Sequence, residues 1–179
     1  MIALAALAAV LAFMVAEQVR SRSNEHMLRR AGAVEPGDDV YRAMAWVYPL
    51  SFVAMGLEGL IRNRPPAAIA AAGVTIFLVS KALKYWAIAT LGPRWTFRVL
   101  VPAQSTLISH GPYAHVRHPN YVAVFGEIIG FALFAGAIVT GVISAAVFGG
   151  LVRRRIRVEE RALGISAPGS PIRDPRRYT

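Results

Sequence analysis

The sequence predicts an all-α integral membrane protein with about five membrane-embedded helices, the last two forming a helical hairpin. Of the 179 residues, 55% are hydrophobic and only 17% are charged, and the mean hydropathy is +0.46. This combination is unusual for a soluble domain. The apolar residues also fall into runs long enough to cross a bilayer, and most basic residues lie between those runs.

Three helices are expected before the hairpin. Residues 1–16 are apolar, and the polar stretch after them has no convincing small-residue cleavage site, so a retained membrane helix is predicted instead of a signal peptide. Residues 43–61 and 66–91 predict the second and third helices. Lys81 and Lys84, near the end of the third, are expected at the membrane boundary, where their long side chains reach water.

The hairpin follows from the length and the charge pattern of the fourth apolar run, residues 121–151. As one straight helix this run would be about 46 Å long, against a hydrocarbon core of roughly 30 Å. A turn near residues 134–141 returns the C-terminal part to the side of the earlier polar loops. All but two of the 20 Lys and Arg then lie on one side of the membrane, which predicts that this side is cytoplasmic and that the N-terminus is outside.

The chain is expected to form one transmembrane domain, residues 1–164, followed by a flexible tail, residues 165–179. The absence of cysteine excludes a disulfide framework, a Cys-ligated zinc site and a thiol nucleophile. The formal net charge of +10 is spread between apolar segments, so no nucleic-acid partner is predicted. The oligomeric state is not indicated by the sequence.

The stretch "HGPYAHVRHPNYVAVFGE", residues 110–127, concentrates polar and aromatic side chains at the start of the fourth apolar run. Pro119 suits the first turn of a helix, and the backbone N–H groups there, with Arg117, suit a carboxylate or phosphate on a ligand. The alternative is that these histidines, tyrosines and arginines are interfacial residues that set the topology. No metal site is predicted, since Pro119 argues against a regular helix through His115 and His118.

Three glutamates stand out further along the chain. Glu127 lies inside an apolar run, where an ionisable group faces a bundle interior or a cavity, either in a functional site or as a buried structural residue. Glu159 and Glu160 follow four arginines, and a solvent-exposed ion pair between Arg155 and Glu159 is the structural alternative for this pair.

The ordered combination "LGPRWTFRV", "LISHGPYAHVRHPNY", a long apolar run and "RIRVEERAL" resembles the isoprenylcysteine carboxyl methyltransferase family of membrane enzymes. The resemblance covers about residues 83–163, the expected catalytic core. It implies a helical enzyme with a cytoplasmic pocket for S-adenosylmethionine, formed without a Rossmann domain. The sequence agrees, because no G-x-G-x-x-G turn is present.

The resemblance also implies the site residues. The positions carried over for cofactor binding are His110, Gly111, Tyr113, His118, Pro119, Tyr121, Arg157, Glu159 and Glu160. Arg117 and Arg157 are candidates for pairing with the cofactor's carboxylate or the acceptor's oxyanion. A carboxylate acceptor needs no general base, whereas a phenol or enol acceptor would make His118 or Glu127 the candidate base.

The expected acceptor is lipophilic and reaches the enzyme from the bilayer of the bacterial inner membrane. Short bacterial members of the family act on long-chain polyketide lipids, so that class and a prenylated cysteine both stay open. Ala123 stands where many members have glycine, and the Pro/Arg-rich tail differs from the usual aromatic ending. Three alternatives remain: a sterol-reductase-like enzyme that uses NADPH, a phospholipid N-methyltransferase, and a non-enzymatic membrane scaffold.

Overall fold

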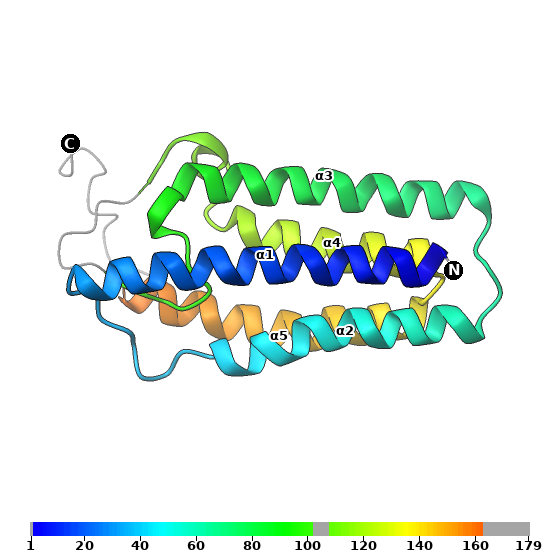
Figure 1. Ribbon diagram of the computed structural model, residues 1–179, viewed down its shortest axis with the longest axis horizontal. Coiled ribbons are helices and arrows are strands. Elements are labelled where there is room, and N and C mark those ends of the chain that lie inside the picture. Colours follow the sequence, from blue (N-terminus) through cyan, green and yellow to red (C-terminus); the bar gives the residue numbers. More distant parts are fainter. Residues whose placement is uncertain (1, 102–107, 163–179) are drawn as a thin grey trace, which may run out of the picture.

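The computed structural model describes residues 2–101 and 108–162, and the regular elements in this part of the chain are helices (Figure 1). Its elements, in order, are α1 (Ile2–Arg30), α2 (Tyr41–Ile61), α3 (Ala67–Leu91), η1 (Gly92–Arg94), η2 (Gly111–Ala114), α4 (Pro119–Ala135) and α5 (Ile138–Ala162). The described residues hold no sheet, only an isolated bridge between Val34 and Val101. The all-α prediction is therefore confirmed here. The predicted tail, residues 165–179, lies outside the described residues.

The five α-helices lie side by side and alternate in direction along the long axis (Figure 1). One end of the bundle, which we call the motif end, holds the loop between α1 and α2, the end of α3, the start of α4 and the end of α5. The opposite end holds the α2–α3 connection and the tight α4–α5 turn. The last two helices therefore form the predicted hairpin.

The hairpin turn falls at Gly136, within the predicted range 134–141. Gly136 has φ +69°, the left-handed conformation that ends many helices, and the N–H of Ala137 donates to Ala132 O at 2.9 Å. The start of α5 is capped from outside, because Glu58 of α2 accepts a hydrogen bond from Thr140 N at 2.7 Å. A carboxylate is favoured at this position by the helix dipole. The turn and this cap together dock the hairpin onto α2.

Helices α1, α2 and α3 are each long and apolar enough to cross a membrane. Helix α4 is apolar but has only 17 residues, about 25 Å at the usual helical rise. Helix α5 has 25 residues, and its C-terminal part is rich in arginine and glutamate. Three candidate spans are thus present in the described residues, and five complete crossings remain a prediction.

Helix α1 continues 14 residues beyond the predicted apolar run, to Arg30. One face of this extension is buried, with members spaced four and three residues apart: Glu17, Ser21, Asn24 and Leu28. Ser21 Oγ accepts a hydrogen bond from Phe97 N at 2.8 Å, and Asn24 donates to Trp95 O at 2.7 Å. The extension therefore holds the segment that follows α3.

Helices α3 and α4 make the most extensive contact in the bundle, and glycines allow it. A Cβ on Gly130 would lie 2.6 Å from Phe77 N, and one on Gly73 would lie 2.5 Å from Phe134 N. Both distances are too short for any side chain, so the two backbones touch directly. This close approach brings the charged residues of α3 against α4.

Candidate functional site

The segment that leads into α4 turns sharply against the end of α3. Gly111 has φ +60°, which favours glycine, and a Cβ there would lie 2.7 Å from Thr90 Oγ1. Pro112 is buried within η2. Pro119 occupies the first turn of α4, where a missing N–H breaks no helical hydrogen bond. These constraints fix the place of His118, which stands at the N-cap position of α4.

Side chains from the start of α4 and the end of α5 meet at the motif end. Nδ1 of His118 lies 3.8 Å from Oε2 of Glu159, and its Nε2 lies 3.6 Å from Oε1 of Glu160. Tyr121 donates its hydroxyl hydrogen to Glu159 at 2.9 Å and stacks on the His118 ring. Arg155 Nε donates to the Tyr121 oxygen at 2.9 Å. We call His118, Tyr121, Arg155, Glu159 and Glu160 the motif cluster.

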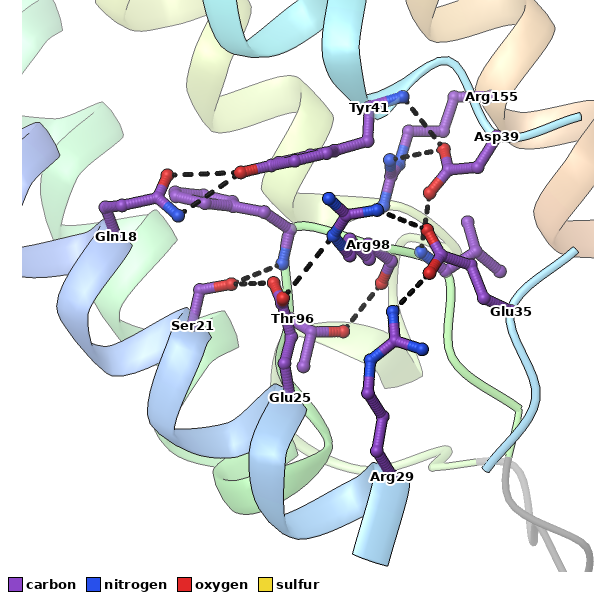
Figure 2. A network of polar contacts seen from close by, with 12 residues as sticks. Gln18, Ser21, Glu25, Arg29, Glu35, Asp39, Tyr41, Thr96, Arg98 and Arg155 are labelled. Carbon is purple, nitrogen blue, oxygen red and sulfur yellow. Dashed lines mark hydrogen bonds and ion pairs between the residues drawn. The ribbon is translucent and has the colours of Figure 1, made fainter. Parts of the chain in front are cut away.

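A second polar network, around Arg98 and Asp39, is linked to this cluster through Arg155 (Figure 2). Arg98 donates to Glu35 at 2.6 Å, and its guanidinium lies 4.4 Å from the centre of the Tyr41 ring. Arg29 of α1 also forms an ion pair with Glu35. The network therefore fastens residues 31–40, between α1 and α2, to the segment after α3.

Glu35 makes the stability of this network depend on pH. Burial alone would raise the pKa of Glu35, but hydrogen bonds from Arg29 and Arg98 lower it below the ordinary value of 4.5. Such a group stabilises the fold above its unfolded-state pKa, and this contribution disappears as pH falls through the folded-state pKa. Glu35→Gln should therefore lower the thermal unfolding midpoint in detergent at pH 7, with a gap from wild type that shrinks as the pH falls below 4.5 and through the lower folded-state pKa. A gap of equal size at pH 7 and pH 3 would contradict this.

A third group of polar side chains lies inside the bundle. Lys81 Nζ is 2.7 Å from Glu17 Oε1 and 3.2 Å from Glu127 Oε2. Lys84 Nζ is 2.7 Å from Glu17 Oε2 and 3.4 Å from Glu127 Oε1. Tyr48 of α2 donates its hydroxyl hydrogen to Glu127. These five residues, which we call the inner charge cluster, join four helices, and their two positive and two negative charges balance.

The expectation that the long side chains of Lys81 and Lys84 reach water is wrong. The side chains of both lysines are at most 7% exposed. Their burial is tolerated because each ammonium group faces two carboxylates, which removes the need to reach water. The pairing is invisible to local sequence patterns, since Glu17 lies 64 residues before Lys81.

Several predicted cofactor-binding positions lie around the motif cluster. Tyr113 is half-buried, and burial together with the charge of Glu159 raises its pKa. Arg117 is largely exposed, and its guanidinium lies 3.9 Å from Glu160. His110, just before η2, is exposed.

Two predicted site residues lie apart from the motif cluster. Arg157 is on an exposed face of α5, and its carbonyl accepts a hydrogen bond from Arg161. Glu127 follows His118 by nine residues on α4, about 13 Å along the helix axis, and it belongs to the inner charge cluster. The structure therefore brings together His118, Tyr121, Glu159 and Glu160, but not Glu127 or Arg157.

Sequence reasoning missed Arg155 and Asp39. The expected surface pair between Arg155 and Glu159 does not form, because Arg155 is buried and pairs with Asp39 at 2.8 Å. The sequence does contain a signal for the burial of Arg155. At helical spacing this residue continues the buried stripe of α5, which is formed by Gly141, Ser144, Phe148 and Val152. No local pattern marks Asp39, which lies 116 residues away.

The motif cluster suits a small cationic ligand. The charge of Arg155 is balanced by Asp39, so Glu159 can face a positive group, and the only arginine paired with Glu160 in the described residues is the largely exposed Arg117. Oδ1 of Asn120 is buried and has no hydrogen-bond partner in residues 2–101 and 108–162, so it can accept from an amino or hydroxyl group of a ligand. The imidazole of His118 can accept a proton.

Comparison with known proteins agrees with the family that the motifs indicate. The family model described as the isoprenylcysteine carboxyl methyltransferase (ICMT) family matches residues 73–165, just over half of the chain. The uncharacterized protein YpbQ of Bacillus subtilis is 32% identical over 148 residues, which cover 83% of this chain and 88% of that protein. An uncharacterized protein of Haemophilus influenzae is 24% identical over 148 residues, 82% of this chain and 86% of that protein.

No solved structure matches the chain. The family match, residues 73–165, covers the motif cluster, which lies between residues 118 and 160. The chain therefore belongs to the isoprenylcysteine carboxyl methyltransferase family, whose members transfer methyl groups at membranes.

Proposed function

We propose that this protein is an S-adenosylmethionine-dependent methyltransferase that methylates an oxygen atom of a lipophilic acceptor. Family membership supports methyl transfer at a membrane. The observation that carries the proposal is the contact of His118 with Glu159 and Glu160. It joins the two stretches that the family resemblance assigns to cofactor binding, although more than 40 residues separate them in the sequence.

The charges of the motif cluster fit this cofactor. S-adenosylmethionine carries one net positive charge, with a cationic sulfonium and ammonium and an anionic carboxylate. Glu159 and Glu160 supply the negative charge for the cationic groups. Arg117, which is exposed and lies 3.9 Å from Glu160, supplies a positive charge for the carboxylate. Asn120 Oδ1 offers a buried acceptor for an amino or hydroxyl group. The rings of Tyr113 and Tyr121 supply apolar walls.

When bound, the cofactor supplies a methyl group activated by the sulfonium. The contribution of the protein is to hold donor and acceptor in line and to exclude water. A carboxylate acceptor requires no proton transfer. A phenol or enol acceptor loses its hydroxyl proton, and we assign the acceptance of that proton to His118, because Glu127 lies deep in the inner charge cluster and already faces two lysines.

The acceptor is proposed to be membrane-soluble, either a prenylated cysteine or a long-chain polyketide lipid. Helix α4 supports this route, since it begins in the motif cluster and carries exposed apolar side chains such as Val122 and Ile129. A lipid acceptor can approach from the bilayer while the polar cofactor arrives from water. The surplus of basic residues at the motif end favours placing this end in the cytoplasm, at a bacterial inner membrane.

The proposal predicts saturable binding of S-adenosylmethionine and of its demethylated product to the purified protein in detergent. Isothermal calorimetry with both ligands, and in parallel with NADPH, provides the measurement. Binding of NADPH alone would replace the proposal with the reductase. Absence of binding by all three in a folded sample would favour a non-enzymatic membrane protein. Positive binding justifies a screen of lipid phenols and prenylcysteines as acceptors.

A further inference from the structure

Asp39, in the loop between α1 and α2, is held in one orientation by three donors. Its Oδ1 accepts from Arg155 Nη1 at 2.8 Å and from Tyr41 N at 3.1 Å, and its Oδ2 accepts from Val99 N at 2.9 Å. The side chain is only 4% exposed. Figure 2 shows this carboxylate between Arg155, the start of α2 and the segment after α3. Because three hydrogen bonds hold the Asp39 carboxylate in place, it can in turn fix the orientation of the Arg155 guanidinium.

The contact with Asp39 determines what Arg155 does. Arg155 uses Nη1 for Asp39 and Nε for the hydroxyl oxygen of Tyr121. A guanidinium only donates hydrogen bonds, so the Tyr121 oxygen must accept from it, and the Tyr121 hydrogen is left for Glu159 Oε2 at 2.9 Å. The direction of every hydrogen bond from Asp39 to Glu159 is therefore fixed.

We propose that Asp39 is a positioning residue for the cofactor site, acting on Glu159 through Arg155 and Tyr121. The inference rests on the proposed function. Its physical basis is competition for Arg155: Glu159 lies one helical turn further along α5, a spacing at which an arginine and a carboxylate pair readily. While Arg155 is bound to Asp39, the charge of Glu159 stays available for a cationic ligand.

Removal of the Asp39 charge releases Arg155 toward Glu159. The new pair neutralises Glu159, which the proposed function assigns, together with Glu160, to the cationic groups of the cofactor. The loss therefore affects a ligand with a sulfonium charge more than a ligand without one. S-adenosylmethionine and its demethylated product differ in this charge and in one methyl group, so together they report on the positioning role. General damage to the fold would weaken both ligands alike.

The test measures the affinity of both ligands by calorimetry for wild type and three variants. We expect Asp39→Asn to weaken S-adenosylmethionine about tenfold, the scale of one charge-assisted contact, and the product much less. Asp39→Glu should recover part of the affinity, because it keeps the charge. Asp38→Asn is the matched control, since neighbouring Asp38 is exposed and pairs with exposed Arg161.

The possible outcomes separate this inference from the proposed function. If wild type binds neither ligand, the proposed function fails. If wild type binds both and Asp39→Asn binds both equally well, the positioning role is overturned. Equal weakening of both ligands by Asp39→Asn, with a lowered thermal unfolding midpoint, assigns Asp39 to stability alone and also overturns it.

Discussion

Glu159→Ala is expected to weaken the binding of S-adenosylmethionine by roughly 10- to 150-fold, because a hydrogen bond or contact that involves a charged group contributes about 1.5–3 kcal/mol. His118→Ala should also weaken the binding of S-adenosylmethionine, since it removes the ring that contacts both carboxylates and stacks on Tyr121. The proteins should stay folded, because Glu159 and His118 are both partly exposed. Calorimetry in detergent, with thermal unfolding of the same samples, measures both effects.

Arg154→Ala is the control for this experiment, because Arg154 lies on an exposed face of the same helix. The affinity of the Arg154→Ala variant for S-adenosylmethionine should match that of wild type. Arg157→Ala tests whether the cofactor site extends to the exposed position that the family resemblance includes. Wild-type affinity in both Glu159→Ala and His118→Ala would remove these two residues from the proposed site.

Lys84→Met is expected to lower the free energy of unfolding by about 3–5 kcal/mol, the usual cost of removing one partner from a buried ion pair. Lys84 is fully buried, and its removal leaves Glu17 and Glu127 with a single ammonium group. A buried excess of negative charge is expensive in a membrane bundle. The shift in the thermal unfolding midpoint of the detergent-solubilised protein provides the measurement.

The double variant Lys84→Met/Glu127→Gln separates charge balance from packing. It restores neutrality to the inner charge cluster and should recover a substantial part of the lost stability. Arg153→Gln, at an exposed position of α5, is the control and should change little. A double variant no more stable than Lys84→Met would show that charge balance is not what the cluster contributes.

Local patterns predicted the helices and the turn between the last two. A 31-residue apolar run is too long for one span, and Gly136 lies where a turn was expected. The same patterns do not predict the second half of α1, because Glu17, Ser21 and Asn24 are polar and follow the apolar run. Their helical spacing was the available signal, and their partners lie in the segment around α3.

The candidate site was predicted through the family motifs, not through spacing alone. The order of the "RHPNY" and "RVEE" stretches indicated that His118 and Glu159 belong to one site, and the hairpin brings them together. Arg155 and Asp39 could not be paired in this way. Their contact depends on how the first loop folds back on α5, a relation between segments more than 100 residues apart.

The inner charge cluster has a consequence for the biosynthesis of the protein. Helix α3 is synthesised before α4, so its two lysines enter the bilayer while Glu127 is still missing. During that interval only one of the two carboxylates of the cluster has been synthesised, Glu17 of α1. Neutralisation of the two lysines is therefore complete only when α4 has been made. By this reasoning residues 73–165, the part that defines the family, would leave a buried excess positive charge if they were produced alone.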